Sequence, residues 1–579
     1  MNGTTRPLEP LAVRDLLLLA IGLLVIVAAG YGLRDPWPAD EPRFAGLARD
    51  MVASGDWLFP RVGGDLYQDK PPLYFWLLAL SYSVFGSVRY SFLLPSLLAA
   101  SGTLFLLYDF GRRLVDRHTG LLAAFATLST LQFVLVMRGA QIDGVLCFFT
   151  TCSLYGLLRH LLLGPAWGWY FVGGLAAGLG VITKGVGFLP ILLLVPYIWL
   201  RRAPWHGVAP LAAAGMKWWL APLGLLLGIA IWLVPMLVAV VQRAAPEYAE
   251  YRDELLLQQT VTRYAKSWHH LRAWYYFLLE VIPALWLPMS ALLFWLVPRW
   301  WRAWQVRDAS VWLPLSWFAL VVLFFSLSPG KRGVYLLPAL PALVIAAMPY
   351  LAELARNRGV HRALIALALL LWSGGLLVLL GYWLGNARIT ELFAASGLRS
   401  IAPVGAFVLL AGVSLTWASW RLPVAAWTVV LGSLALTWAY GIAPTLDAER
   451  SGSRFVRGML AKVPVGYTLG LVGYKEQFLL YLDRPTVNFG HRRWLEGPQE
   501  NFDAAAWLAL APYRVLLVPK GALEPCFPEA RDRIFAGESS DEEWYLVRGS
   551  PNRKCVEQGD AARAIRYGYP NGVPAARGP

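Results

Sequence analysis

The segment that decides the fold spans residues 40–76 and reads DEPRFAGLARDMVASGDWLFPRVGGDLYQDKPPLYFW. It follows the first strongly apolar run of the chain and lies in an interval, residues 34–89, that holds six basic and seven acidic side chains. Placing an ionised group at the centre of a bilayer costs about 2.5–3.5 kcal/mol. We therefore expect this interval at a membrane interface or in a wet cavity.

The composition of the whole chain indicates a membrane protein. Of the 579 residues, 57% are hydrophobic and only 15% are charged, whereas soluble domains average about 25% charged residues. Apolar runs of about 20 residues, each long enough to cross a bilayer, recur along the chain. The net charge of +15 suits loops that set topology and contact membrane lipids, so no nucleic-acid partner is predicted.

Hydropathy predicts an all-α polytopic membrane protein with about thirteen transmembrane helices. Their expected ranges are 15–33, 91–110, 119–137, 142–163, 168–183, 186–200, 217–241, 274–297, 311–327, 334–351, 363–384, 402–419 and 424–444. The run 72–86 is apolar but short, and we expect an interfacial helix there. Residues 16–33 could instead be a signal peptide, but their length and the many similar spans favour an uncleaved first helix.

The arginines predict the orientation of these spans. With the N-terminus in the cytoplasm, the short cytoplasmic loops carry Arg112, Arg113, Arg117, Arg159, Arg201, Arg202, Arg299, Arg302, Arg307, Arg356, Arg358, Arg362 and Arg421. This enrichment is what the positive-inside rule requires. An odd number of spans then sends the C-terminus to the external side.

Two domains are predicted, and the boundary is a change of composition. Residues 1–444 form the transmembrane domain, in which 34–90 is the first external loop, and residues 445–579 form a small external α/β domain. In the second domain VGYTLGLVGY, QFLLYLDRPTVNFG and YRVLLVP are expected to contain short strands, and NFDAAAWLALA a helix. The basic, Gly- and Pro-rich tail, 560–579, is expected to be disordered.

The four cysteines fall into two pairs. Cys526 and Cys555 lie in the external domain, where an oxidising compartment would allow them to form a disulfide. Cys147 and Cys152 lie within a predicted span and are expected to be packing residues.

The charges of the first external loop have two possible explanations. They could be topological, neutralising one another beside a span. Alternatively they could form a site, because Pro71 and Pro72 stiffen the backbone just after Lys70 and aromatic side chains crowd the loop. Further ionisable groups are expected on the same face of the membrane, namely Asp143, Lys184, Arg263, His269, His270, Lys331 and Arg332.

A mixture of carboxylates and cations at an interface suits transfer of a sugar from a lipid carrier better than it suits ion conduction. The carrier phosphate needs cations, and an attacking hydroxyl needs a carboxylate. Carboxylates can also hold a divalent cation. A transporter of lipid-linked sugar remains an alternative, although transporters usually have ionisable residues or broken helices near the middle of the membrane.

The loop resembles the first external loop of the polyprenyl-phosphate-dependent GT-C glycosyltransferases. These membrane enzymes include the aminoarabinose transferases that act on lipid A and the protein O-mannosyltransferases. The motifs DEP-R-F, GDW-x-x-P and KPPLYFW carry the resemblance, and GLAAGLGVITKGVGFLP (with its core at 178–190) and FSLSPGKRGVYLLPALPAL (325–343) are similar to two later landmarks. The resemblance in sequence covers about residues 15–350. The rest of the chain is similar to the family in its architecture only.

The resemblance implies roles for individual residues. Asp40 and Asp143 would be the catalytic carboxylates, with Asp40 acting as a base or orienting the acceptor. The residues that hold the carrier phosphate would be Lys70, Arg263 and Tyr335. Supporting positions are Glu41, Arg43, Tyr67 and Lys331.

Departures from the family pattern leave the metal and the exact sugar open. Asp69 stands where the aminoarabinose enzymes have a glutamate, and Phe44 where they have a tyrosine. A metal-binding histidine of the family is replaced by Thr260 or a neighbour. If a divalent metal ion is bound, Asp69 and His269 are its candidate ligands.

Several of these residues also have plainer explanations. Asp143 could cap a helix, Lys184 could be an interfacial anchor, and Arg263 could pair with Glu254 or Asp253. The run GGLAAGLG at 173–180 is expected to bring two helices close together rather than to cradle a phosphate.

The resemblance implies an inverting glycosyltransferase of the bacterial inner membrane, and the predicted topology places its C-terminal domain in the periplasm. The donor would be a sugar on polyprenyl (undecaprenyl) phosphate, and the favoured reaction moves a 4-amino-4-deoxy-L-arabinose-like sugar to lipid A. The alternative acceptors are a protein, as in the O-mannosyltransferases, or another envelope glycan.

Overall fold

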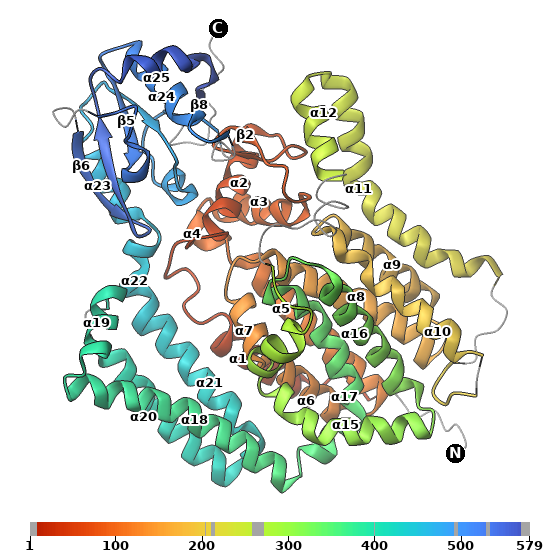
Figure 1. Ribbon diagram of the computed structural model, residues 1–579. Helices are drawn as coiled ribbons and strands as arrows, with labels where there is room; N and C mark the ends of the chain where they lie inside the picture. The colour runs from red at the N-terminus through yellow and green to blue at the C-terminus, as the bar shows by residue number, and fades with distance from the viewer. Residues whose placement is uncertain are drawn as a thin grey trace. The chain divides into compact units, whose positions relative to one another are not determined.

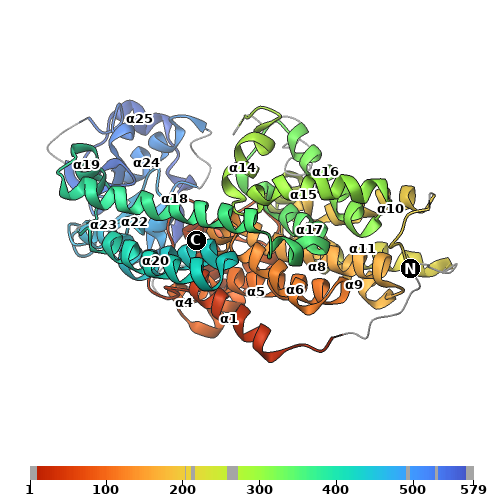
Figure 2. The same cartoon turned by 90° about the horizontal axis from the view of Figure 1, so that it is seen from below.

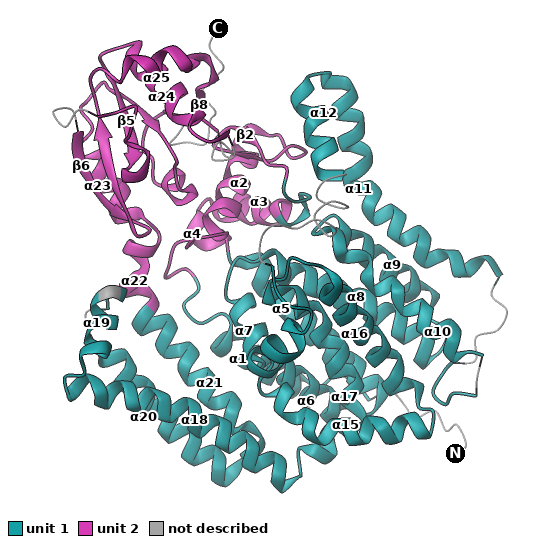
Figure 3. Ribbon diagram, viewed as in Figure 1, with its two compact units in different colours: residues 1–31, 69–74, 93–442 teal, residues 32–68, 75–92, 443–579 magenta. Residues whose placement is uncertain are grey.

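A computed structural model describes most of the chain. The described residues are 9–202, 204–209, 215–256, 271–398, 400–490, 496–528 and 533–568. They fall into two compact units (Figure 3), of which unit 1 comprises residues 1–31, 69–74 and 93–442, and unit 2 comprises 32–68, 75–92 and 443–579. Unit 2 thus contains most of the 34–90 loop, and the chain returns to unit 2 at residue 443, close to the expected boundary at residue 445.

The named secondary-structure elements of unit 1 are all helices within its described residues (Figure 1). Its α-helices are α1 (Val13–Ile26), α5 (Leu94–Leu114), α6 (Arg117–Leu128), α7 (Leu131–Met137), α8 (Ile142–Leu163), α9 (Trp167–Val181), α10 (Leu194–Leu200), α11 (Leu220–Arg243), α12 (Pro246–Asp253), α14 (Ile282–Leu285), α15 (Met289–Gln305), α16 (Ala309–Leu327), α17 (Leu340–Leu354), α18 (Arg358–Trp383), α19 (Ala387–Ser396), α20 (Ala402–Arg421) and α21 (Ala426–Thr437). Short 3₁₀ and π turns extend some of them, namely η1 (Gly185–Leu193), η2 (Gly215–Trp219), η4 (Phe277–Val281), η5 (Gly333–Ala339), η6 (Pro423–Ala425) and η7 (Trp438–Ile442).

The helices confirm a polytopic membrane protein. Within the described residues, 8 helices are long and apolar enough to cross a membrane, and up to 10 if each of two bent pairs counts as one span. Every one of the thirteen predicted ranges contains a helix. The count of thirteen crossings itself stays a prediction, because helices such as α1, with 14 residues, are short for a span.

Polar side chains fix where several helices begin. The Asp116 carboxylate accepts a hydrogen bond from the Thr119 N–H at 2.7 Å at the start of α6. Asn357 accepts from the Gly359 N–H at 2.8 Å at the start of α18. Such caps satisfy backbone donors that the first helical turn leaves without partners.

Two bent helix pairs are joined by a buried glutamine. The pair α6–α7 bends by 68°, and the pair η4/α14–α15 bends by 114°. The Leu131 N–H of the first bend donates to the Leu287 carbonyl of the second at 3.0 Å. Gln132 accepts from the Trp286 indole N–H at 2.5 Å and donates to the Gly333 carbonyl at 2.6 Å. These bonds satisfy polar groups that the breaks expose inside an apolar core.

Small residues bring α9 and α11 close together, which confirms the helix-packing interpretation of GGLAAGLG. A Cβ atom added at Gly174 would lie 2.0 Å from the Ala221 carbonyl oxygen, and one at Gly178 would lie 2.3 Å from the Leu225 carbonyl oxygen. Only glycine permits backbones to approach so closely.

The helices α18, α20 and α21 form a separate hydrophobic cluster around Phe407, Ala411 and Val430. Figure 2 shows α18 beside α20. Only 11% of the most apolar window of α18 is buried, against 78% for α8. The exposed leucines of α18, such as Leu370 and Leu377, are suited to contact lipid.

Unit 2 is an α/β unit. Its elements are α2 (Glu41–Ser54), β1 (Arg61–Val62), β2 (Asp65–Leu66), α3 (Leu73–Phe85, which begins in unit 1), α4 (Val88–Ser91), α22 (Ala443–Arg450), α23 (Ser453–Leu460), β3 (Thr468–Leu471), η8 (Glu476–Leu480), β4 (Thr486–Asn488), α24 (Gln499–Ala509), β5 (Arg514–Pro519), η10 (Lys520–Ala522), β6 (Arg533–Ser539), β7 (Glu542–Val547), α25 (Arg553–Gln558), η12 (Ala561–Arg563) and β8 (Ile565–Tyr567). The predicted helix at 72–86 is therefore present as α3.

A mixed six-stranded sheet organises unit 2. Its strand order is β6-β7-β5-β3-β4-β8, with β3 parallel to β4 and to β5 and the outer strands antiparallel. Leu469 of β3 lies opposite Thr486 of β4 and Val515 of β5. Cys526 and Cys555 form the predicted disulfide, with Cα atoms 5.5 Å apart, whereas Cys147 is a buried free thiol in α8.

The predicted disorder of the tail is wrong for residues 560–568. This part contains η12 and β8, and β8 pairs antiparallel with β4. Tyr567 is buried there, and its hydroxyl donates to the Asp50 carboxylate at 2.9 Å. Pairing and burial thus order a segment whose composition alone favours disorder. Residues 569–579 lie outside the described residues.

Candidate active site

The tightest charged pair among the predicted site residues lies in unit 1. The Lys184 ammonium nitrogen lies 2.6 Å from Oδ1 of Asp143. Asp143 is in the first turn of α8, and Lys184 immediately precedes η1. Only 12% of the Lys184 side chain and 8% of the Asp143 side chain are exposed. A close ion pair with so little exposure fixes both side chains in place.

Tyr335 completes this cluster. The Lys184 ammonium lies 4.3 Å from the centre of the Tyr335 ring, which is within the range of a cation–π interaction. Tyr335 belongs to η5, and its ring also packs against Phe325 at 5.8 Å. The structure therefore brings two predicted site residues, Asp143 and Tyr335, together around one ammonium group.

The Lys70 segment belongs to unit 1 as well. The Leu73 N–H donates to the Ile182 carbonyl at 3.1 Å, and Ile182 is two residues before Lys184. Pro71 and Pro72 lack an N–H, so this bond fixes the first amide after them. The Lys70 ammonium donates to the carbonyl oxygen of Asp69 at 2.9 Å.

Lys331 is engaged by backbone carbonyls. Its ammonium donates to the Ser328 carbonyl at 2.5 Å and to the Arg272 carbonyl at 3.0 Å. The side chain is buried, and burial lowers the pKa of the Lys331 ammonium. These contacts close the loop between α16 and η5, and the supporting role of Lys331 stays a prediction.

In unit 2, Asp40 immediately precedes α2, and Arg43 lies in its first turn. Arg43 Nη1 lies 3.8 Å from Oδ1 of Asp40, whereas Nη2 lies 2.9 Å from Oε1 of Glu476. Burial by itself lowers the pKa of Arg43, but the neighbouring Tyr67, Glu476 and Asp40 outweigh it, and the pKa is raised. The guanidinium therefore stays charged between two carboxylates.

Glu41 anchors the start of the 34–90 loop. Its two carboxylate oxygens lie 2.5 Å and 2.8 Å from the two terminal nitrogens of Arg34. It also accepts from the Trp37 N–H at 2.9 Å. This two-pronged pairing restrains orientation as well as position, and the supporting role of Glu41 stays a prediction. Tyr67 is buried nearby in the same unit, with its ring against Phe75.

The predicted metal site is not tested by these residues. Asp69 is described, but Arg263 and His269 lie outside the described residues. Within the described part of the chain, no three side chains of His, Cys, Asp or Glu form a group that could hold a metal ion. We therefore derive no step of the reaction through a metal, and binding at Asp69 and His269 stays a prediction.

Two functional candidates come mainly from the structure. Lys184 lies in the landmark GLAAGLGVITKGVGFLP. The sequence alone allowed Lys184 to be an interfacial anchor, and its pairing with Asp143 is seen only in the structure. Glu476 is the first residue of η8, and nothing in its local sequence indicates that it contacts Arg43, 433 residues away.

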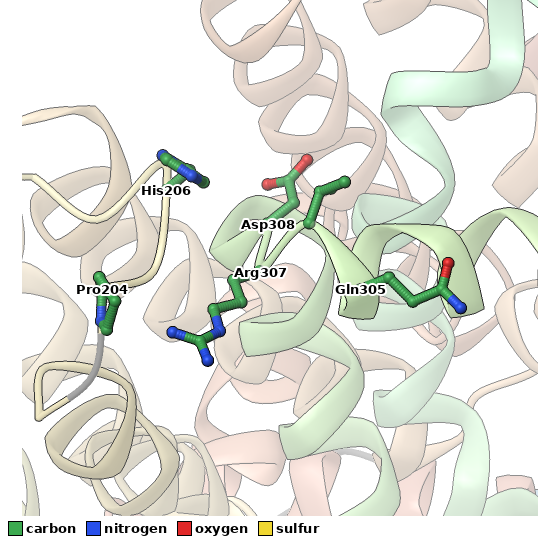
Figure 4. A pocket seen from close by; sticks show the side chains of 6 residues that line it. Pro204, His206, Gln305, Arg307 and Asp308 are labelled. Carbon is green, nitrogen blue, oxygen red and sulfur yellow. The ribbon is translucent and has the colours of Figure 1, made fainter.

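A surface pocket of about 560 Å³ lies elsewhere in unit 1. It is lined by Pro204, His206, Gln305, Val306, Arg307 and Asp308, and Figure 4 shows their side chains. None of the predicted site residues lines it. Two segments that line the pocket are joined by the His206 N–H, which donates to the Arg307 carbonyl at 2.8 Å.

Comparison with known proteins decides the family. The family described as dolichyl-phosphate-mannose-protein mannosyltransferase matches residues 69–232. The undecaprenyl phosphate-alpha-4-amino-4-deoxy-L-arabinose arabinosyl transferase of Pseudomonas aeruginosa (strain UCBPP-PA14) is 30% identical over 432 residues, which cover 72% of this chain and 73% of the relative. The chain belongs to this arabinosyl transferase family. The transferase numbered 2 of Sodalis glossinidius is 30% identical over 344 residues, covering 57% and 59%.

The fold of this transferase matches a solved one. The crystal structure of ArnT from Cupriavidus metallidurans bound to undecaprenyl phosphate superposes with a TM-score of 0.72 and 21% identity, covering 93% of this chain and 98% of that one. This likeness confirms the predicted GT-C fold, and membership of the arabinosyl transferase family confirms the predicted glycosyltransferase activity. This arabinosyl transferase is a polytopic membrane enzyme.

Proposed function

We propose that the enzyme transfers 4-amino-4-deoxy-L-arabinose, or a similar sugar, from undecaprenyl phosphate to lipid A. The observation that carries this proposal is the 30% identity to the P. aeruginosa transferase over 72% of the chain. The name of that relative gives both the carrier and the sugar. Lipid A is the acceptor that the resemblance of the 34–90 loop implies.

A protein is the second candidate acceptor. The match of residues 69–232 to the protein mannosyltransferase family supports it. The donor chemistry would be the same, and the attacking group would be the hydroxyl of a serine or threonine. The matched range contains Lys70, Asp143 and Lys184, which act on the donor side in this proposal.

The proposed setting is the bacterial inner membrane, with thirteen crossings, the N-terminus in the cytoplasm and the C-terminal α/β domain in the periplasm. The helix found in each predicted range supports the count. The arginine-rich short loops support the orientation.

On the donor side, cations hold the carrier phosphate. The bond between the anomeric carbon of the sugar and the phosphate oxygen breaks, so negative charge grows on the leaving undecaprenyl phosphate. Fixed cations stabilise that charge most where it develops, in the transition state. We assign this role to Lys70, Arg263 and Lys184, with Tyr335 as a further phosphate contact. The Asp143 carboxylate, 2.6 Å from Lys184, sets the position of that ammonium.

On the acceptor side, Asp40 meets the attacking group. If the acceptor is a hydroxyl, its oxygen forms the new bond to the anomeric carbon and its proton passes to the Asp40 carboxylate. If the acceptor is a phosphate of lipid A, it is already anionic, and Asp40 orients it or the sugar amine. Attack from the face opposite the leaving phosphate inverts the anomeric centre, and no covalent sugar–enzyme intermediate forms.

The proposal is tested with the purified enzyme in lipid nanodiscs. Undecaprenyl-phosphate-linked aminoarabinose is supplied with lipid A or, separately, with a peptide rich in serine and threonine. We expect sugar on lipid A and free undecaprenyl phosphate in equal amounts. Transfer to the peptide alone would replace the acceptor, and no transfer from this donor to either acceptor would contradict the proposed sugar.

A further inference from the structure

The 34–90 loop is joined by polar contacts at three places to η8 and β4 of unit 2. Arg43 pairs with Glu476, the first residue of η8. Arg49 of α2 donates to the Leu479 carbonyl at 3.2 Å. The Asn488 amide of β4 donates to the Gly63 carbonyl at 2.7 Å. The helix η8 therefore holds α2, and β4 holds the β1–β2 turn.

Gly63 shows how closely this turn is fitted. Its φ is +59°, in the left-handed region, where a side chain is strained. A Cβ atom there would also lie 2.7 Å from the Tyr474 hydroxyl oxygen and 3.1 Å from the Asn488 amide nitrogen. The fit indicates that Tyr474 and Asn488 restrict where the β1–β2 turn lies.

Of these three contacts, the one made by Arg43 also involves Asp40. The Nε and Nη2 atoms of Arg43 lie 3.0 Å and 2.9 Å from the same Glu476 oxygen, Oε1. Its remaining terminal nitrogen, Nη1, is 3.8 Å from Oδ1 of Asp40. Contacts at 2.9–3.0 Å are charge-assisted hydrogen bonds, whereas 3.8 Å is too long for one. Arg43, which Tyr67 also contacts, thus pairs more closely with Glu476 than with Asp40.

Removing Glu476 would change that preference. The guanidinium is a rigid fork suited to a carboxylate, and Asp40, three residues before Arg43, is within reach on the same turn. Without Glu476, Arg43 would close on Asp40 and occupy the oxygens that have to meet the acceptor. The exposed fractions, 22% for Arg43 and 19% for Asp40, leave both side chains room to move.

We propose that Glu476 is a positioning residue for Asp40, because it holds Arg43 and prevents the guanidinium from closing on the Asp40 carboxylate. This inference rests on the proposed function, in which Asp40 meets the acceptor. It gives the C-terminal domain a part in the reaction that is distinct from acceptor binding.

The test is the steady-state kinetics of the full-length enzyme in nanodiscs, with the donor and lipid A as above. We expect Glu476→Gln to lower kcat about tenfold and to leave the KM for the donor within about twofold, because the donor phosphate contacts other residues. Glu476→Asp keeps the charge and should retain more of kcat than Glu476→Gln. An unchanged kcat in Glu476→Gln would overturn the inference.

A double-variant cycle separates positioning from general stabilisation. If Glu476 acts through Arg43, Glu476→Gln should have almost no further effect on kcat in an Arg43→Ala background. Losses that multiply in the double variant would overturn the inference. If Glu476→Gln does not fold, Glu476→Asp takes its place in the cycle, with a smaller loss that must again vanish without Arg43.

A matched control is Glu542 of β7, which pairs with the residue just before Glu476. Glu542→Gln removes an ion pair with Lys475, whose ammonium lies 3.3 Å from Oε2 of Glu542, and should leave kcat unchanged. Asp40→Asn distinguishes a failure of the proposed function from a failure of the inference about Glu476. Full activity in Asp40→Asn would contradict the proposed function, whereas an inactive Asp40→Asn with a fully active Glu476→Gln would contradict only the inference.

Discussion

The two units each hold a predicted catalytic carboxylate beside a cation, but they hold it differently. In unit 1, Asp143 lies 2.6 Å from Lys184. In unit 2, Asp40 lies 3.8 Å from Arg43, which is bound more closely to Glu476. The Asp143 side chain is 8% exposed, and the Asp40 side chain is 19% exposed.

This difference supports different roles for the two carboxylates in the proposed reaction. A carboxylate in a tight, buried pair is committed to its partner and serves to place that cation. Asp40 lies 3.8 Å from Arg43, and Arg43 also pairs with Glu476. A carboxylate in such a looser pair is better able to accept a proton or to orient an acceptor. The comparison therefore favours Asp143 as the residue that positions Lys184 and Asp40 as the base.

The largest expected effect is that of Asp40→Asn. Loss of a general base costs about 10²–10⁴-fold in rate, so we expect kcat to fall about 10³-fold while the melting temperature changes little. The measurement is the initial rate of sugar transfer in nanodiscs. Asp483→Asn, which disturbs only an exposed pair with Arg484 at 2.7 Å, is the control. Equal rates for the wild type and Asp40→Asn would remove Asp40 from the chemistry.

Lys184→Met should have the next largest effect. We expect it to lower the free energy of unfolding as well as the activity. It leaves Asp143 buried without its ion-pair partner, which costs about 3–5 kcal/mol. Adding Asp143→Asn should restore most of the free energy of unfolding, measured by thermal and denaturant unfolding in detergent. Activity should not return with it. If activity recovers together with stability, the pair is only structural.

Lys70→Ala should weaken the donor site without unfolding the enzyme. A hydrogen bond to a charged group is worth about 1.5–3 kcal/mol, so we expect the KM for the donor and the Kd for undecaprenyl phosphate to rise about tenfold or more. Kd is measured by titration of the carrier into nanodiscs. Lys462→Ala, which removes donors to backbone carbonyls of β6, is the control. An unchanged Kd would exclude Lys70 from the phosphate site.

The smallest expected effect concerns the ordered part of the tail. Tyr567→Phe removes a hydroxyl that donates to Asp50 and accepts from Arg49, and it should lower the free energy of unfolding by about 1–2 kcal/mol. The measurement is denaturant unfolding followed by tryptophan fluorescence. Tyr513→Phe, at a half-exposed tyrosine, should change nothing. No difference between the two variants would show that the tail contributes little to the unit 2 core.

Much of the fold follows from the sequence because crossing a membrane imposes a strong local pattern. A run of about 20 apolar residues is visible without knowing any partner, and so are buried strands such as β5, whose five residues Val515–Pro519 are all buried. The strand β8 was missed because Ile565–Tyr567 is short and lies in a basic, Gly- and Pro-rich context. Its order comes from pairing with β4, which is a tertiary effect.

The site was only partly predictable for a related reason. The motifs of the 34–90 loop identify Asp40 and Lys70 within one continuous segment. Other residues of the site have partners that lie far away in the sequence. Lys184 pairs with Asp143, and Glu476 pairs with Arg43. The local sequence does not indicate such pairs. The difference between Asp143, which is held tightly by Lys184, and Asp40, whose cation also pairs with Glu476, is visible only in the folded chain.

The central claim is that the enzyme moves aminoarabinose from undecaprenyl phosphate to lipid A, with Asp40 as the essential carboxylate. It is tested most directly by mass spectrometry of lipid A and of envelope glycoproteins from cells that lack the chain, complemented with the wild type or with Asp40→Asn. We predict a pentosamine-sized increment on lipid A that the wild type restores and Asp40→Asn does not. An unchanged lipid A together with loss of sugar from a protein or another glycan would contradict the proposed acceptor.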